Sequence, residues 1–552
     1  MVEPSMDLEE YLPPKELWPD LVVPEEFKDL PDQFNLTEYL LENHLREGRA
    51  DQTVIYFEDE KITYGEIARN VNSLGKSFID LGIAPRDRIG VRMTNRPQAI
   101  IANLAILKIG AIPVPVPPLW SAKEIVYVTE DALLRAMVVD RFLLGAVRQA
   151  EKLLTSDMLI IVVDDNSAND MPLGDRHYAF SDLLARESEN FASFKLKQND
   201  IAVLLYTSGT TGPPKGCAQT TSGVFISSSL VAKNIYGLHE GGILGGPAPI
   251  SFAAGFGTFV FIPLISRGAI SLLPKFSPEG LLKNIARHKV TVLTGIPTAY
   301  RKMLGSKALD TCDLSSLRLC TVGGDALDDA TLETWKAKTG LPVWLNYGIT
   351  ETFHVLLSTR IGKILGGNSI GKPVPGYEAR VLDGDGHPCA SGVMGTLAVR
   401  GPTGTIYWNP RRNGGRLMKS QQMIVKNGWN MVDDYVVQDD TANFRYVCRQ
   451  DDMIKSSGYR LGPEEIESVI LEHPSVQEAV VIGVPDSIRG QAIKAFVVLK
   501  KGVIRRPGLE GEIKEFCRDH IALYKLPHIF EFVLDLPKTA MGKIIRKHLR
   551  AS

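Results

Sequence analysis

The sequence predicts an α/β protein with a large N-terminal domain of mixed α/β sheets, a small β-rich subdomain and a small α+β C-terminal domain. Three observations favour this fold class. Helical patterns alternate with short β-branched runs from Asn35 to about Ile270, which is typical of parallel sheets with crossover helices. Strands and turn dipeptides alternate from about Gly371. Because 552 residues exceed a single core, we expect domains at 1–450 and 451–552.

The N-terminal elements follow from local patterns. Residues 62–82 read as an amphipathic helix that ends at a glycine cap. Residues 88–93, 98–110 and 111–116 predict strand, helix and strand, which form a parallel crossover unit. Further strands are predicted at residues 159–165, 201–206 and 289–295.

The C-terminal elements are read in the same way. Residues 376–402 predict the β-rich subdomain. Residues 448–476 run from a charged loop to a strand and a helix, and residues 477–486 and 491–502 predict two more strands. This is the pattern of a compact α+β domain.

Composition excludes several classes of protein. A net charge of −2 gives no basic field for nucleic acid or an anionic membrane, and no apolar run reaches the roughly 18–20 residues of a membrane span. The acidic, proline-rich N-terminus resembles no targeting peptide. Six scattered cysteines form no zinc or disulfide pattern, and Cys217 is expected to be a small filler. We expect a cytoplasmic protein, with a homodimer left open.

The segment "YTSGTTGPPKG" begins at Tyr206, directly after a buried strand. Its glycines and small hydroxyl residues suggest a loop that wraps phosphate. It is not the common P-loop, because Pro214 precedes Lys215 and Gly216 follows it.

Four later motifs carry candidate chemistry. Glu351 in "NYGITETFH" offers a hard oxygen for magnesium, although Thr350 could instead cap a helix. Asp434 in "GWNMVDD" offers a carboxylate for a diol, or simply faces water. Arg449 and Asp451 stand at the expected domain boundary, and Lys543 follows Gly542 in the terminal "LPKTAMGKIIR", where a lysine can reach an anion.

Taken in order, these motifs resemble the adenylate-forming superfamily of acyl-CoA synthetases, carrier-linked adenylation domains and luciferases. The resemblance extends from about Asn35 to Arg550. It implies that a carboxylate attacks ATP, expels pyrophosphate and forms an acyl-adenylate, which a thiol, usually coenzyme A, then takes. The implied co-substrates and cofactor are ATP, coenzyme A and Mg²⁺.

The resemblance also implies residue roles. Lys543, Thr350 and Glu351 are the catalytic candidates, with Thr350 at the α-phosphate and Glu351 on the metal. The loop should wrap the β- and γ-phosphates, Tyr347 should stack on adenine, and Asp434 and Arg449 should hold the ribose. The full ATP and AMP set is Thr207, Ser208, Gly209, Thr210, Thr211, Lys215, Gly324, Asp325, Ala326, Tyr347, Gly348, Thr350, Asp434, Arg449 and Lys543.

A mobile C-terminal domain is implied as well. Asp451 matches the hinge about which this domain rotates between the two steps. Rotation would withdraw Lys543 and bring in the face that carries Gly458, which can line a narrow pantetheine tunnel. Arg460 matches a residue that contacts the nucleotide or supports the rotated state.

Two positions depart from the family pattern. Val432 stands where relatives carry a turn residue of a threonine-glycine-aspartate motif, so the turn before Asp434 has lost its glycine. Phe252 stands where many relatives carry a histidine. Neither removes a catalytic group.

The local match is best to the benzoate and 2-aminobenzoate CoA ligase branch, through "GITETFHVLLSTR" and "GKPVPGYEARVLD". Phe252 and Phe256, four apart, could face one side of a flat ring if helical, or Phe256 could pack in the core. Medium-chain acids and short branched or 2-hydroxy acids are the alternatives. The expected acid pocket is Phe252, Ala253, Gly255, Phe256, Gly323, Ile349 and His354.

Two readings from other classes stay open. One is an adenylation enzyme that loads a separate carrier protein. The other is a non-catalytic nucleotide-binding protein, against which the presence of Glu351 and Lys543 argues.

Overall fold

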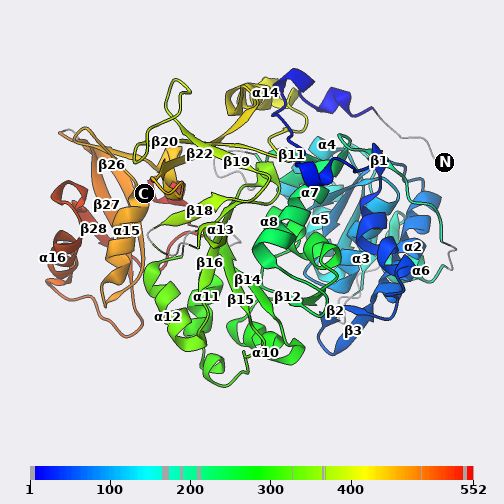
Figure 1. Ribbon diagram of the computed structural model, residues 1–552, viewed down its shortest axis with the longest axis horizontal. Coiled ribbons are helices and arrows are strands. Elements are labelled where there is room, and N and C mark those ends of the chain that lie inside the picture. The colour runs from blue at the N-terminus through cyan, green and yellow to red at the C-terminus, as the bar shows by residue number, and fades with distance from the viewer. Residues whose placement is uncertain are drawn as a thin grey trace.

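A computed structural model describes residues 7–164, 173–186, 190–207, 213–325, 327–363, 366, 368–486, 488–538 and 544–550, without the side chains of Asn413 and Arg460. Ser208, Gly209, Thr210, Thr211, Ala326 and Lys543 therefore lie outside the described residues. Figure 1 shows a large α/β body and a smaller C-terminal unit at its side. The predicted fold class, with a large N-terminal and a smaller C-terminal domain, is confirmed.

One sheet near the N-terminus is entirely parallel. Its strand order is β5-β4-β6-β7-β8. The predicted strand–helix–strand unit is present as β4, α3 and β5, and β4 and β5 pair in parallel. The bounds are β4 Arg88–Arg92, β5 Ile112–Pro115, β6 Leu134–Asp140, β7 Leu159–Val163, β8 His177–Ala179, α3 Pro97–Lys108, α4 Ala122–Ala132, α5 Leu144–Glu151 and α6 Phe180–Leu184.

The long central sheet positions most candidate site residues. Its order runs β3-β2-β13-β12-β14-β15-β16-β17-β18-β23-β22-β20-β19, parallel from β2 to β16 and antiparallel beyond. The parallel half comprises β2 Thr53–Phe57, β12 Ile243–Gly245, β13 Ala269–Leu272, β14 Val292–Gly295, β15 Leu319–Gly323 and β16 Val343–Gly348, with β3 Glu60–Thr63 at its edge. The β-rich half comprises β17 Val355–Ser358, β18 Ser369–Pro373, β19 Glu378–Leu382, β20 Met394–Arg400, β21 Val425–Lys426, β22 Trp429–Gln438 and β23 Phe444–Arg449.

Helices cover these sheets and fix their ends. The predicted helix at residues 62–82 is α2 (Tyr64–Asp80), which starts with a capping box between Thr63 and Glu66 and is followed by Gly82 at φ +79°, as a glycine cap requires. The remaining helices of this domain are α1 Asn43–Arg46, α7 Thr221–Val231, α8 Ala253–Phe256, α9 Ile262–Ile265, α10 Pro278–His288, α11 Pro297–Leu304, α12 Asp329–Thr339, α13 Thr359–Gly362 and α14 Arg412–Ile424. Two short sheets are β1 (Gln33–Phe34) with β9 (Leu196–Lys197), and β10 (Ile201–Tyr206) with β11 (Gly216–Thr220).

The C-terminal unit has its own sheet and core. Strand order is β25-β24-β27-β26, and β28 pairs with β27. A cluster of buried apolar side chains, among them Ile454, Ile466 and Ile493, lies between this sheet and its helices. The bounds are β24 Ile454–Ser456, β25 Tyr459–Leu461, β26 Val476–Asp486, β27 Gly490–Leu499, β28 Ile529–Phe532, α15 Pro463–Glu472, α16 Leu509–His520 and α17 Arg546–Arg550. The boundary at residue 450 stays a prediction.

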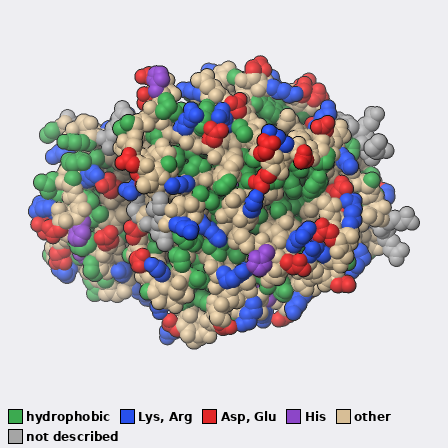
Figure 2. Space-filling view, viewed as in Figure 1, with side chains coloured by type: hydrophobic (Ala, Val, Ile, Leu, Met, Phe, Trp, Pro, Cys, Tyr) green, Lys and Arg blue, Asp and Glu red, His purple; other side chains and the backbone are tan. Residues whose placement is uncertain are grey.

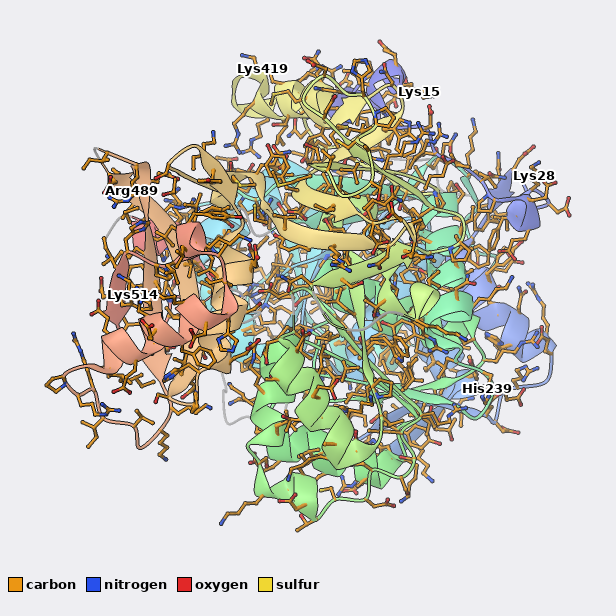
Figure 3. All side chains as sticks on the ribbon, turned by 60° about the vertical axis from the view of Figure 1, so that its left-hand side comes forward. Lys15, Lys28, His239, Lys419, Arg489 and Lys514 are labelled. Atoms are coloured by element: carbon orange, nitrogen blue, oxygen red, sulfur yellow. The ribbon has the colours of Figure 1, made fainter. Side chains whose placement is uncertain are left out.

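The surface agrees with the near-zero net charge. Figure 2 shows basic and acidic side chains interspersed over the displayed face. In Figure 3, Arg489 and Lys514 mark the outer side of the C-terminal unit, whereas Lys15 and Lys419 lie at the α14 end of the molecule. Among the described helices, none is both long enough and apolar enough to cross a bilayer.

Candidate active site

The carboxyl ends of the parallel strands gather the predicted residues at one edge of the central sheet. Gly323 ends β15 and pairs with Asn346 of β16. Tyr347 and Gly348 end β16, and Ile349 to Glu351 follow. Ligands bind at this edge in open α/β sheets, so the topology gathers residues that are distant in the chain.

The described ends of the phosphate loop are held together. Strands β10 and β11 form an antiparallel hairpin in which Tyr206 pairs with Gly216. The Thr207 amide donates to the Lys215 carbonyl at 3.0 Å. The Lys215 amide donates to Thr207 Oγ1 at 3.4 Å. The hairpin thus closes the base of the loop, while the loop's role in binding phosphate stays a prediction.

The buried carboxylate of Asp131 anchors this hairpin through Tyr206. The Tyr206 hydroxyl donates to Asp131 Oδ2 at 2.6 Å, and Arg412 Nη1 lies 3.3 Å from Asp131 Oδ1. The Trp408 indole donates to the Asp131 carbonyl at 2.9 Å. Burial raises the pKa of Asp131, but hydrogen bonds from three side chains, Tyr206, Arg412 and Asn409, satisfy the carboxylate.

Glu351 lies in a 3-10 turn, Thr350–Thr352, between β16 and β17. The turn carries no side-chain cap, so the alternative in which Thr350 caps a helix is wrong. The Glu351 carbonyl accepts from Gln219 Nε2 at 3.1 Å, and Oε1 accepts from the Tyr407 hydroxyl at 3.4 Å. Burial raises the pKa of Glu351, and the nearby Lys215 and Arg449 oppose that rise.

A strained backbone turn separates Glu351 from His354. Phe353 has φ +70° and ψ −54°, and the His354 amide donates to the Thr352 carbonyl at 2.8 Å. This is the γ-turn whose central residue has positive φ, a rare and costly conformation. Such strain persists where surrounding contacts impose it, often at functional sites.

The turn places His354 in a buried position against Gly257. The imidazole is 5% exposed, and its Nδ1 accepts from the Val355 amide at 2.8 Å. A Cβ on Gly257 would come within 2.7 Å of the ring. Burial lowers the pKa of His354 to about 4, so the imidazole is neutral at pH 7.

The two phenylalanines of the predicted acid pocket do not share a helix face. Phe252 is half-buried and precedes α8 in extended backbone, with φ −122°. Phe256 is fully buried and packs edge-on against Phe261 and Phe353. The expectation that both face one side of a flat ring is wrong, because α8 begins only at Ala253. Phe256 follows the core-packing alternative.

Other residues of the predicted pocket flank this position. A Cβ on Gly255 would lie 2.0 Å from the Pro249 carbonyl oxygen, so no side chain fits there. Ala253 and Ile349 are half-buried, as is Gly323. Their contact with an acid stays a prediction.

The predicted ribose and adenine residues meet. The Tyr347 hydroxyl donates to Asp434 Oδ2 at 2.5 Å. Asp434 and Arg449 are cross-strand partners on β22 and β23, with 3.8 Å between Oδ1 and Nε. Gly324, at φ +87°, and Asp325 are exposed beyond β15.

The C-terminal unit places its tail toward this edge. Lys538 and Ile544 form a β-bridge on either side of the undescribed terminal loop. Arg546 pairs with both oxygens of Glu467 at 2.7 Å. Burial opposes the charge, but nearby carboxylates, Glu467 most and Asp325 least, raise the pKa of Arg546. The chain on the C-terminal side of Lys543 therefore lies beside the segment predicted to line adenine.

The face that carries Gly458 points to solvent in this arrangement. Gly458 is exposed at φ +82°, with no atom within 4 Å of its Cβ position. Tyr459, 49% exposed, stacks on Tyr524 with ring centroids 4.3 Å apart. Asp451 is exposed in the turn Gln450–Asp452.

Sequence reasoning missed two residues of this site. Tyr407 contacts Glu351, and Lys215 Nζ lies 5.4 Å from the centre of its ring. Asp131 holds Tyr206. The aromatic run "IYW" around Tyr407 looks like core, and Asp131 looks like an ordinary helix residue, so no local signal marks either one.

A family model described as AMP-binding enzyme matches residues 41–408. A second, described as AMP-binding enzyme C-terminal domain, matches residues 465–543. The first covers more than half of the chain. The chain belongs to the AMP-binding enzyme family.

Known members of the AMP-binding family are similar over nearly the whole chain. A benzoate–CoA ligase of Thauera aromatica is 32% identical, with 95% of this chain and 97% of that relative covered. A long-chain-fatty-acid–CoA ligase of Bacillus subtilis is 31% identical, with 94% and 96% covered. The crystal structure of an anthranilate CoA ligase in complex with anthranoyl-AMP has a TM-score of 0.87 at 30% identity, with 95% and 98% covered.

These similarities confirm the resemblance to the adenylate-forming superfamily and to its benzoate and aminobenzoate CoA ligase branch. The AMP-binding enzyme is thus an AMP-forming acid–CoA ligase that uses ATP and coenzyme A. The non-catalytic reading is not supported.

Proposed function

We propose that the enzyme activates an aromatic acid of the benzoate type, or another compact carboxylic acid, and transfers it to coenzyme A. The observation that carries this proposal is the closed contact between His354 and Gly257. Behind it, Phe256, Phe261 and Phe353 pack edge to face. If His354 lines the acid site, this packed aromatic core would leave little room behind it for a long alkyl chain. The benzoate and anthranilate ligases among the relatives support the same class.

Two other acid classes follow from the relatives and the pocket candidates. Medium-chain acids are the second candidate, because the segment "GVPDSIRGQAIKAFVVL" at residues 483–499 resembles medium-chain acyl-CoA synthetases. Short branched or 2-hydroxy acids are the third, because a methylene changes binding by only about 1–3 kcal/mol.

The nucleotide roles that we propose are those implied by the family resemblance, and the contacts between Tyr347, Asp434 and Arg449 support them. Asp434 and Arg449 would hold the ribose, with Tyr347 on the adenine and Thr350 at the α-phosphate. The loop from Thr207 to Lys215 would wrap the β- and γ-phosphates.

Glu351 fits a magnesium site, because its half-buried carboxylate offers a hard oxygen next to the loop. Bound magnesium would neutralise the phosphate charge that otherwise repels the carboxylate substrate. Tyr407 and Lys215 would orient the carboxylate and the phosphates.

The C-terminal part, residues 451–552, would act as a mobile domain on the nucleotide- and acid-binding residues 1–450. In the arrangement described here, Arg546 beside the terminal loop is within electrostatic range of Asp325 and Gly458 faces solvent. This suits the first step, with Lys543 directed at the nucleotide. Rotation about Asp451 would then bring Gly458 and Arg460 inward for the thiol step.

The partners we propose are small molecules, namely the acid, ATP and coenzyme A, without nucleic acid or membrane. A cytoplasmic location and a homodimer stay predictions.

Acid-dependent exchange of pyrophosphate into ATP tests the proposal. The panel contains benzoate, 2-aminobenzoate, a short branched acid, a 2-hydroxy acid and octanoate, and acyl-CoA is measured in parallel. We expect exchange and thioester formation with the aromatic acids. Preference for octanoate would favour the medium-chain alternative, and exchange without consumption of coenzyme A would favour carrier loading. If none of the acids on the panel supports pyrophosphate exchange, the proposed function is refuted.

A further inference from the structure

Tyr407 contacts three parts of the proposed nucleotide site: strand β11, the carboxylate of Glu351 and the side chain of Lys215. Its main chain forms a β-bridge with Cys217, and on either side Ala218 donates to the Ile406 carbonyl and Trp408 to the Gly216 carbonyl, both at 2.8 Å. The segment thereby lies along β11 through an isolated β-bridge, on the outer side of the two-stranded hairpin at the base of the predicted phosphate loop.

The main chain of Tyr407 is also held from the opposite side. Its amide donates to Gln421 Oε1 at 3.0 Å. Gln421 is fully buried on α14, and its Nε2 donates to the carbonyls of Leu17 and Thr405 at 2.9 and 2.8 Å. Tyr407 therefore has little freedom to move relative to β11.

The side chain of Tyr407 is buried, and its hydroxyl needs a partner. The ring has no exposed surface and packs with Cys217 and Leu417. A phenylalanine would fill this apolar cluster as well. A phenol hydroxyl in such a place is costly unless it is hydrogen-bonded, and the described acceptor is Glu351 Oε1 at 3.4 Å.

The same ring carries the loop lysine. Lys215 Nζ lies 5.4 Å from the ring centroid, within the range of a cation–π contact. The edge of Tyr407 therefore contacts the acidic group of the site while its face contacts a basic group. One rigid side chain sets the distance between the two.

We propose that Tyr407 is a positioning residue that fixes the carboxylate of Glu351 through its hydroxyl and seats Lys215 on its ring. The inference rests on the proposed function, because it takes Glu351 as the ligand of the divalent ion. With Oε1 held by the phenol, the carboxylate is oriented before the ion arrives. Partners that orient a metal ligand in this way typically contribute about 10–100-fold to metal affinity or activity.

Tyr407→Phe tests the role, because it removes one hydroxyl and keeps the ring. Mn²⁺ binding to the full-length enzyme with ATP is followed by electron paramagnetic resonance of free Mn²⁺. We expect Mn²⁺ affinity to fall about tenfold, with an equal rise in the Mg²⁺ concentration needed for half-maximal pyrophosphate exchange. Tyr300→Phe is the matched control, since that buried hydroxyl donates to the Thr321 carbonyl at 2.9 Å and contacts no proposed ligand.

A double-mutant cycle separates a role through Glu351 from a general loss of packing. If Tyr407 acts through that carboxylate, Tyr407→Phe should weaken Mn²⁺ binding no further in a Glu351→Gln background. A full additive loss there, or wild-type Mn²⁺ affinity in Tyr407→Phe alone, would overturn the inference. Melting temperatures of all variants control for folding.

The proposed function can fail separately. If no acid on the panel supports pyrophosphate exchange by the wild-type enzyme, the proposed function is refuted. The Mn²⁺ affinities of the wild type and Tyr407→Phe are measured without any acid, so this comparison does not depend on that result. Loss of Mn²⁺ affinity in Tyr407→Phe would support the positioning role in either case.

Discussion

The imidazole of His354 lies so close to Gly257 that a Cβ there would stand 2.7 Å from Cδ2 and 3.0 Å from Nε2. His354 has little room to retreat, because it is buried and Nδ1 accepts from the Val355 amide. The γ-turn at Phe353 fixes the backbone just before it. The position of the His354 ring therefore requires a residue without a side chain at Gly257.

Gly257→Ala should weaken use of the acid while sparing ATP. The added methyl group must displace the imidazole, and a displacement of this size at a binding group can cost tenfold or more. We expect the KM of the acid to rise about tenfold with the KM of ATP unchanged, measured by pyrophosphate exchange. Gly145→Ala is the control, since nothing lies within 4 Å of its Cβ position. An unchanged KM for the acid would show that His354 does not line its site.

His354 also predicts how stability depends on pH. Its pKa is lowered from 6.5 to about 4 in the folded chain, so between these values the unfolded chain binds more protons. The free energy of unfolding should therefore fall as pH drops from 7 toward 4, with about 2 kcal/mol from this group by pH 5. His354→Asn removes that contribution. Urea unfolding at pH 7 and pH 5 should show the wild type losing more stability than the variant, and parallel losses would contradict the assignment.

Elements with a strong local signal were predictable from the sequence. The helix at residues 62–82 has a helical period that matches its buried face. The crossover unit at 88–116 consists of apolar runs that are buried almost throughout, so in both cases the local signal agrees with the tertiary structure. Helix α14 was not predicted, because Gly414 and Gly415 oppose a helix and both take positive φ. Its Gln421 is instead held by the distant Leu17 carbonyl, a contact that no local pattern encodes.

The candidate site likewise contains residues that the sequence predicts and residues that it does not. The order of motifs predicted that Asp434 and Arg449 belong together, and strands β22 and β23 make them neighbours. The lost glycine before Asp434 needs no compensation in the backbone, because Asp433, which stands in its place, continues strand β22 and does not take a positive φ. Tyr407 could not be predicted, since its partners Glu351 and Lys215 are far away in the chain and meet it only through the fold.

Asp434→Asn should raise the KM of ATP. The carboxylate accepts from Tyr347 and faces Arg449, and the change removes a charged acceptor from the predicted ribose site. Hydrogen bonds to charged groups contribute about 1.5–3 kcal/mol, which corresponds to about 10–100-fold in affinity. The control is Asp433→Asn, because Asp433 is exposed on the same strand. Equal effects of the two changes on ATP would refute the ribose role of Asp434.

Lys543→Ala should separate the two steps of the reaction. Lys543 itself lies outside the described residues, but Ile544 bridges Lys538, and Arg546 is anchored on Glu467 within electrostatic range of Asp325, a residue of the segment predicted to line adenine. A lysine delivered from this tail would neutralise phosphate charge only while the acyl-adenylate forms. We expect adenylation to fall at least about 100-fold, whereas transfer from supplied acyl-adenylate to coenzyme A stays within about twofold. The control is Lys547→Ala, an exposed lysine of the same tail, which should leave both steps unchanged. Comparable losses in both half-reactions of Lys543→Ala would mean that this lysine contributes to folding or to both steps. That result would contradict the proposal that the C-terminal domain moves Lys543 away between the two steps.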